Sequence, residues 1–145
     1  MKSLADIALE YIESENKYGI DKDLYHYNCA EVLLNACNDY YNLKVSKDML
    51  KAVIPFGGGM CSESTCGILT GSVLALGLIF AEDKPSSNEK VKKITSEWLG
   101  IFEYKFGNIN CKELKTSHSD SEFGCRPLIL EASDLLEQVI GRYYN

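Results

Sequence analysis

Residues 66–80 carry no charged side chain, and most of them are apolar. The apolar run continues only to Ala81 and is interrupted by polar or small residues, so it is too short to cross a bilayer, which needs about 20 apolar residues. A helix that is apolar on every side belongs in the interior of a protein. The sequence therefore predicts a buried central helix over 66–80 and no membrane partner.

Segments on both sides of this stretch have the apolar spacing of amphipathic helices. Leu4, Ile7, Ala8 and Tyr11 predict a helix over 4–17 that stops at Tyr18-Gly19. Further helices are expected from 29 to about 43, from 47 to before Pro55, from 89 to 106, from 111, and from about 126 to 140. We find no strand pattern, repeat or linker. The sequence predicts an all-α, single-domain helical bundle of about five to seven helices over residues 1–145.

Composition narrows the class of partner and the compartment. The chain has 46% hydrophobic and 25% charged residues, which is typical of a globular domain. Its net charge of −6 would be repelled by a phosphate backbone, and no basic cluster offsets it, so nucleic-acid binding is not expected. Residues 1–13 carry acidic side chains through their apolar stretch, unlike a signal peptide. We therefore predict a cytoplasmic protein.

Six cysteines are many for a reducing compartment, where such a pattern more often indicates metal binding or catalysis than disulfides. Four of them share a local position, because each is predicted in the first turn of a helix: Cys29, Cys66, Cys111 and Cys125. A helix start carries unpaired N–H groups and a partial positive charge. That environment favours the thiolate, which is the form that attacks disulfides and binds metals.

The other candidates are weaker. Cys37 lies mid-helix among apolar residues and is expected to be ordinary core, whereas Cys61 and His118 could each supplement a site made by the four cysteines. No pair of Cys-x-x-Cys knuckles is present, so the fold would have to assemble the site from separate helix ends. Glu31 and Glu113 each lie three residues after an asparagine. We expect them to complete capping boxes with Asn28 and Asn110 rather than to serve as acid–base partners.

Three blocks of sequence resemble a known family of redox-active proteins named for the cysteine pattern C_GCAxxG_C_C, which is related to a domain of the split-Soret cytochromes. The blocks are Tyr27-Asn28-Cys29-Ala30-Glu31, Phe56-Gly57-Gly58-Gly59-Met60, and Cys66-Gly67-Ile68-Leu69-Thr70-Gly71 running on to Leu78. Cys111 and Cys125 occupy the two trailing cysteine positions. The resemblance covers about residues 20–140.

The resemblance implies an all-helical domain with four redox-active cysteines, here Cys29, Cys66, Cys111 and Cys125, and in the cytochrome relatives an iron–sulfur centre beside haem. Two departures are present: the Gly-Cys-Ala of the pattern is Thr65-Cys66-Gly67 here, and the following glycine, Gly71, comes one residue late. There is no Cys-x-x-Cys-His, so covalent haem is not expected.

Three functions remain open from the sequence. The first is binding of a 2Fe–2S cluster, or less favourably zinc, by the four cysteines for electron transfer with a redox partner protein. The second is a metal-free thiol/disulfide oxidoreductase that uses a pair such as Cys29 and Cys66, and the third is a helical interaction domain with structural cysteines. The nine tyrosines and the apolar central helix would suit a homodimer. The electron donor, the acceptor and the substrate are not indicated.

Overall fold

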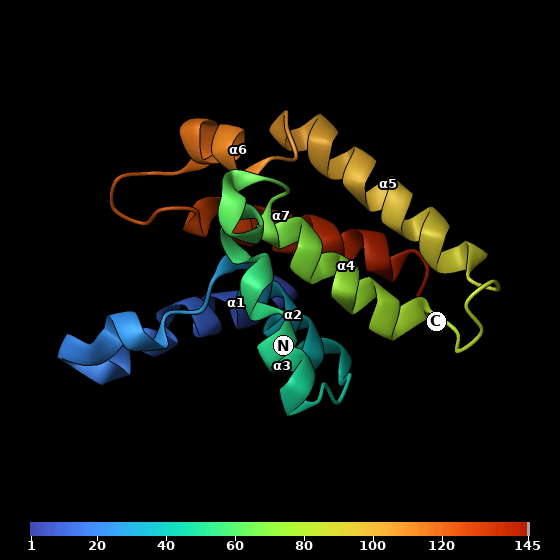
Figure 1. Cartoon of the computed structure of the whole chain (residues 1–145), viewed down its shortest axis with the longest axis horizontal. Helices are drawn as coiled ribbons and strands as arrows, with labels where there is room; N and C mark the ends of the chain where they lie inside the picture. The colour runs from blue at the N-terminus through green and yellow to red at the C-terminus, as the bar shows by residue number, and fades with distance from the viewer. Residues whose placement is uncertain (145) are drawn as a thin grey trace.

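The computed structural model describes residues 1–144 and consists of helices joined by short loops (Figure 1). The α-helices are α1 (Leu4–Glu13), α2 (Cys29–Tyr41), α3 (Lys47–Ala52), α4 (Gly67–Phe80), α5 (Glu89–Phe106), α6 (Cys111–His118) and α7 (Arg126–Gly141). Shorter or tighter helical segments are η1 (Ser14–Tyr25), η2 (Ile54–Phe56) and η3 (Gly59–Glu63). Within residues 1–144 there is no strand, only two isolated bridges. The all-α prediction is confirmed.

Helix α4 organises the core, as its apolar sequence predicts. It packs mainly against α2 and also contacts α5 and α7, which lie along it in Figure 1. Ile68, Leu69 and Leu76 on α4 are fully or almost fully buried, but Leu78 is 38% exposed. Helix α4 is therefore central, as predicted, although its outer face reaches the surface. No helix in the described part of the chain is both long and apolar enough to span a membrane.

Small residues bring α4 against α2. A Cβ built on Gly71 would lie 2.4 Å from the carbonyl oxygen of Ala30, and one on Gly67 would lie 3.2 Å from the Cβ of Cys29. The two helices therefore touch backbone to backbone at their N-terminal ends. This contact places Cys66, directly before α4, close to the start of α2.

Helix α5 is fixed to α4 by a buried polar contact. The indole Nε1–H of Trp98 donates to the hydroxyl of Ser72 at 2.7 Å, and that hydroxyl donates in turn to the Leu69 carbonyl at 3.0 Å. Both side chains are fully buried. A buried polar group must be hydrogen-bonded to avoid a desolvation cost, so this chain of bonds fixes how α5 sits on α4.

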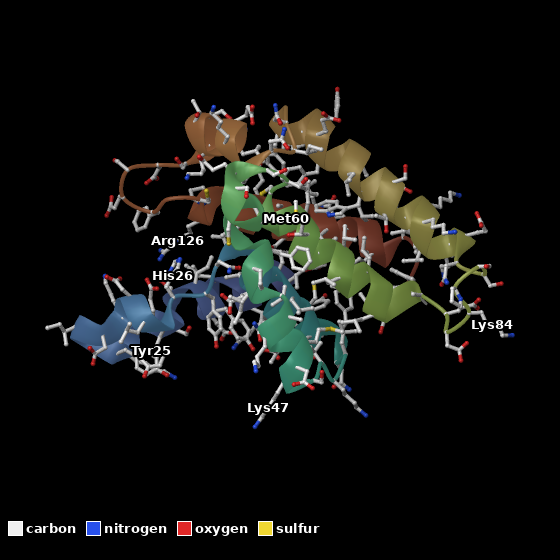
Figure 2. The ribbon with its side chains drawn as sticks, in the orientation of Figure 1. Tyr25, His26, Lys47, Met60, Lys84 and Arg126 are labelled. Atoms are coloured by element: carbon white, nitrogen blue, oxygen red, sulfur yellow. The ribbon has the colours of Figure 1, made fainter. Side chains whose placement is uncertain are left out.

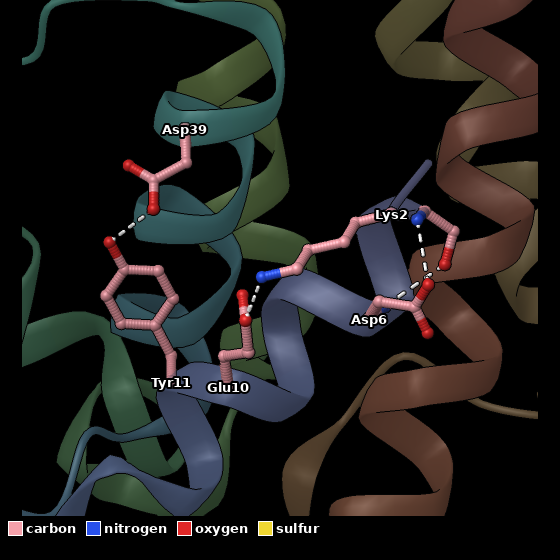
Figure 3. A network of polar contacts seen from close by, with 6 residues as sticks. Lys2, Asp6, Glu10, Tyr11 and Asp39 are labelled. Atoms are coloured by element: carbon pink, nitrogen blue, oxygen red, sulfur yellow. Dashed lines mark hydrogen bonds and ion pairs between the residues drawn. The ribbon is translucent and has the colours of Figure 1, made fainter.

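The N-terminal helix is shorter than its periodicity predicts. Helix α1 ends at Glu13, and residues 14–25 form η1, a 3₁₀ segment with no buried residue that protrudes from the bundle in Figure 1. Gly19 interrupts η1 with φ of +57°. Helix α1 is tied to α2 by the Tyr11 hydroxyl, which donates to Asp39 at 2.6 Å (Figure 3). The helix predicted over 4–17 is correct only to Glu13, because the following residues have no core to pack against.

Candidate functional site

The four candidate cysteines lie at four helix starts. Cys29 and Cys111 are the first residues of α2 and α6, and Cys66 and Cys125 immediately precede α4 and α7. The first-turn position is confirmed for Cys29 and Cys111. Cys66 and Cys125 each lie one residue earlier than expected, at the capping position.

Only one of the two expected capping boxes forms. The Asn28 side chain accepts from the Glu31 N–H at 2.9 Å, and the Glu31 carboxylate accepts from the Asn28 N–H at 3.1 Å. The side chain of Asn110 makes no capping bond, so the prediction for Asn110 and Glu113 is wrong. Asn108 binds this loop instead, because its Oδ1 accepts from the N–H groups of residues 109 and 110.

Cys66 and Cys111 are brought together by a short antiparallel ladder around a bridge between Thr65 and Asn110. The Cys66 N–H donates to the Ile109 carbonyl at 2.8 Å, and the Cys111 N–H donates to the Ser64 carbonyl at 2.6 Å. These bonds join the two chain segments that lead into α4 and α6. Two cysteines that are far apart in sequence are thereby fixed side by side.

A left-handed turn packs on this pair. Four consecutive residues, 58–61, have φ between +57° and +66°, although two of them are the non-glycine residues Met60 and Cys61. A left-handed conformation costs an L-residue about 1 to 2 kcal/mol. Gly59 sits so close to α6 that an added Cβ would lie 2.7 Å from the Cβ of Cys111. Such backbone strain clusters at functional sites.

All four cysteines line one cavity of about 430 Å³. It opens between the N-terminal ends of α2, α4, α6 and α7, and Ser119, Phe123, Gly124 and Cys125 supply part of its wall. The remaining lining side chains are mostly apolar and include Ile12, Leu114, Phe123, Leu128 and Ile129. The spatial grouping expected for Cys29, Cys66, Cys111 and Cys125 is therefore present, with all six cysteines of the chain as free thiols.

Two of the four thiols are hydrogen-bonded to each other. The Cys29 thiol donates to the Cys125 sulfur, which raises the pKa of Cys29 well above its ordinary value and lowers the pKa of Cys125 to about 7. Lys115 and His118 also lower the pKa of Cys125 by their positive charge. The negative charge of this pair therefore resides on Cys125, the half-buried partner.

The prediction of a thiolate at every helix start is wrong for the other three cysteines of the cavity. Burial raises the pKa of Cys66 to about 11, although the N–H groups of Ile68 and Leu69 oppose that shift by hydrogen bonding to its sulfur. Burial likewise raises the pKa of Cys111, with Lys115 opposing. Desolvation and the mutual repulsion of neighbouring thiolates outweigh the helix ends. Among the four cavity cysteines, only Cys125 has a pKa low enough for it to be charged near neutral pH.

We expect the alkylation rate of Cys125 by iodoacetamide to rise through a midpoint near pH 7, because a lowered pKa makes the reactive thiolate abundant above that pH. Replacing Cys29 with alanine removes the hydrogen-bond donor, so the midpoint should move up toward the ordinary value for cysteine. Cys29→Ser keeps a donor and should shift it less. Peptide mass spectrometry across pH gives each midpoint, and identical midpoints in both variants would contradict the assignment.

The supplementary candidates lie outside the cavity. Cys61 is exposed on η3, and its thiol donates to the Pro55 carbonyl at 3.6 Å. His118 Nε2 is hydrogen-bonded to the Phe106 carbonyl at 2.8 Å, so that nitrogen already has a partner outside the cavity. Cys37 is fully buried in the core, as predicted, and burial raises its pKa to about 12. Among residues 1–144, no three His, Cys, Asp or Glu side chains converge closely enough to hold a single metal ion.

Two cationic residues that line the cavity, Lys115 and Arg126, were not predicted from the sequence. Both follow a cysteine at a spacing that could have identified them. Lys115 lies one helical turn after Cys111, and Arg126 follows Cys125 directly. On a helix, residues four apart share a face, so Lys115 points to the same side as the Cys111 thiol.

Comparison with protein families gives a match over most of the chain. Residues 27–139 match the family described as "Putative redox-active protein (C_GCAxxG_C_C)". No curated protein and no solved structure matches the chain. The match begins just before the Asn28 cap, ends within α7, and includes all four cysteines of the cavity. It covers well over half of the sequence, and the chain therefore belongs to the C_GCAxxG_C_C family of redox-active proteins.

Proposed function

We propose that the four cysteines of the cavity bind a 2Fe–2S cluster and that the protein transfers electrons between redox partner proteins. The observation that carries this proposal is that Cys29, Cys66, Cys111 and Cys125 line one cavity from four separate helix starts. Thiolates are the ligands that iron–sulfur clusters use. No Asp or Glu is among the described residues that line the cavity, so sulfur is the dominant donor.

The spacing of the donors favours a cluster over a single zinc ion. In residues 1–144, no three donors converge on a common point, and the thiols instead surround a space of about 430 Å³. A cluster, when bound, supplies reversible one-electron chemistry, and hydrogen bonds to its sulfur ligands adjust its potential. The backbone N–H groups of Ile68 and Leu69 act to lower the pKa of Cys66 and would stabilise its thiolate.

Anaerobic reconstitution tests the proposal. The full chain, incubated with ferrous iron and sulfide, should acquire visible absorbance and about two irons per chain, as a 2Fe–2S cluster requires. Replacing all four cavity cysteines with serine should abolish both signals. Cys61→Ser, which removes an exposed thiol outside the cavity, should leave them unchanged. A wild-type chain that stays colourless, or a fourfold variant that binds as much iron, would refute the cluster.

A second function is favoured by the hydrogen bond between Cys29 and Cys125, which places a donor thiol against a sulfur with pKa about 7. In a metal-free protein, this pair would act as a dithiol. Oxidation would form one S–S bond between the two sulfurs and release two protons and two electrons to an oxidised partner. A colourless chain with a measurable Cys29–Cys125 disulfide potential would support this function. The absence of that disulfide after titration with oxidised dithiothreitol would exclude it.

A further inference from the structure

Basic side chains line the cavity around the cysteines, although the protein as a whole is acidic. They are Lys115 from α6, Arg126 from α7 and His26 from the segment before α2. Figure 2 labels Arg126 and His26, which lie close together in that view. The chain has 21 Asp and Glu residues and a net charge of −6, yet none of the described acidic residues lines the cavity. Clefts lined by one sign of charge concentrate ligands of the opposite sign.

The carboxylates nearest to these cations lie outside the cavity. Glu63 pairs with Lys115 at 3.4 Å and Glu13 with Arg126 at 3.9 Å, and both carboxylates are about half exposed, at 54% and 49%. Glu15 contacts His26 at 2.7 Å. Exposed ion pairs of this kind contribute about 0 to 1 kcal/mol. They therefore leave the cations able to bind an incoming anion.

Arg126 is partly buried at this site. Its guanidinium stacks 4.7 Å from the Phe123 ring centroid, and its side chain is 27% exposed. The Nε atom is buried and has no hydrogen-bond partner among residues 1–144, so it lies out of reach of a ligand in the cavity. An anion would therefore be bound by the terminal N–H groups of the guanidinium, which favour carboxylate-like partners.

The loop between α6 and α7 contributes no carboxylate to the cavity. The side chain of Asp120 is held in a local turn, because its Oδ1 accepts from the N–H groups of Glu122 and Phe123 at 2.8 and 2.6 Å. Phe123 lines the cavity, whereas Asp120 and Glu122 do not. The loop thus contributes an aromatic ring and no negative charge.

The size and the apolar surface fit a small organic molecule. Pockets for such ligands have volumes of about 300 to 1,000 Å³ and are mostly apolar, with a few polar groups that fix orientation. This cavity has about 430 Å³ and apolar walls from Ile12, Leu114, Leu128 and Ile129. The cations lie among these side chains, so one ligand can contact both.

We propose that the cavity binds a small organic anion, a carboxylate or sulfonate on an apolar body, directly beside the four cysteines. Lys115 and Arg126 bind the anionic group, and the apolar walls bind the body. The cations thereby select which small molecules reach the thiols. This binding does not require the cluster and goes beyond the proposed electron transfer.

A matched pair of fluorescent probes tests the proposal on the anaerobically purified full chain. 8-Anilinonaphthalene-1-sulfonate and N-phenyl-1-naphthylamine share an apolar body, but only the first carries a sulfonate. We expect the sulfonate to bind with a Kd at least about tenfold lower and to lose that preference in high salt, where charges are screened. The sulfonate probe at saturating concentration should also slow the alkylation of Cys125 by iodoacetamide, which would show that the probe binds in the cavity.

Charge removal supplies the decisive comparison. Lys115→Gln combined with Arg126→Gln should abolish the preference for the sulfonate. Binding of the neutral probe should stay unchanged, which would show that the cavity is intact in this variant. Lys92→Gln combined with Lys112→Gln removes the same charge from exposed positions outside the cavity and should keep the preference. Equal affinity for both probes in the wild type, or equal losses in both double variants, would overturn the proposal.

The two proposals fail independently. If the chain takes up iron and sulfide but shows no preference for the sulfonate, the cluster proposal stands and the anion-site proposal fails. If the chain binds the sulfonate through Lys115 and Arg126 but stays colourless, the anion-site proposal stands and the cluster proposal fails. Iron content and probe affinity are measured on the same preparation, so each result is assigned to one proposal.

Discussion

Replacing Gly71 with alanine is expected to lower the free energy of unfolding by about 1 to 3 kcal/mol, the usual cost of overpacking a tight core. The new Cβ would lie 2.4 Å from the Ala30 carbonyl oxygen and 2.9 Å from the Ala30 Cα. Both are backbone atoms, so no side chain can rotate away and α2 must separate from α4. Urea unfolding followed by circular dichroism measures the loss.

Gly77→Ala is the matched control for this experiment. Gly77 lies on the same helix, and nothing lies within 4 Å of its added Cβ. Alanine is favoured over glycine in a helix interior by about 1 kcal/mol, so this variant should be as stable as the wild type or more so. If Gly71→Ala proves as stable as Gly77→Ala, the backbone contact between α2 and α4 does not limit the packing of the fold.

Replacing Gly59 with alanine is expected to cost stability for two separate reasons. Its φ of +66° is unfavourable for alanine by about 1 to 2 kcal/mol. In addition, the Cβ would lie 2.5 Å from the Ser64 N atom and 2.7 Å from the Cys111 Cβ, which adds an overpacking cost of about 1 to 3 kcal/mol. Urea unfolding should therefore show one of the largest losses of any single methyl addition in this chain.

Gly58→Ala separates these two costs. Gly58 has nearly the same conformation, with φ of +61°, but nothing lies within 4 Å of its added Cβ. It should therefore show only the conformational cost, and the difference between the variants measures the close packing of Gly59 against Ser64 and Cys111 together. Equal losses would mean that neither contact limits the space at Gly59.

The helical fold follows from local patterns in the sequence. The apolar periodicity places α2, α5 and α7 where they occur, and the Asn28 capping box fixes the start of α2. Residues 14–25 escaped prediction because their 3₁₀ conformation lacks a buried stripe. In the left-handed turn at 58–61, Gly58 and Gly59 are residues that favour such angles, whereas Met60 and Cys61 ordinarily avoid them and only the packed structure imposes them.

The position of the cysteines was more predictable than their chemistry. Each cysteine lies at or directly before a helix start, which is a local property readable from caps and periodicity. The pKa values depend on distances between segments that are remote in sequence, and these distances determine burial and thiol–thiol repulsion. The cations of the cavity depend likewise on how α6 and α7 meet. The hydrogen-bonded pair is Cys29 with Cys125, whereas the sequence suggested Cys29 with Cys66.

The ladder around Thr65 and Asn110 has a consequence for how this site meets a ligand. Its two hydrogen bonds fix the chain beside Cys66 and Cys111 when the protein folds. Binding of a ligand to these two cysteines should therefore cost little further conformational entropy. The turn before Cys125 is closed in the same way, by two hydrogen bonds between Asp120 and Gly124. A ligand should therefore meet a preformed site, with slow hydrogen exchange at the amides of Cys66, Cys111 and Gly124 already in the free protein.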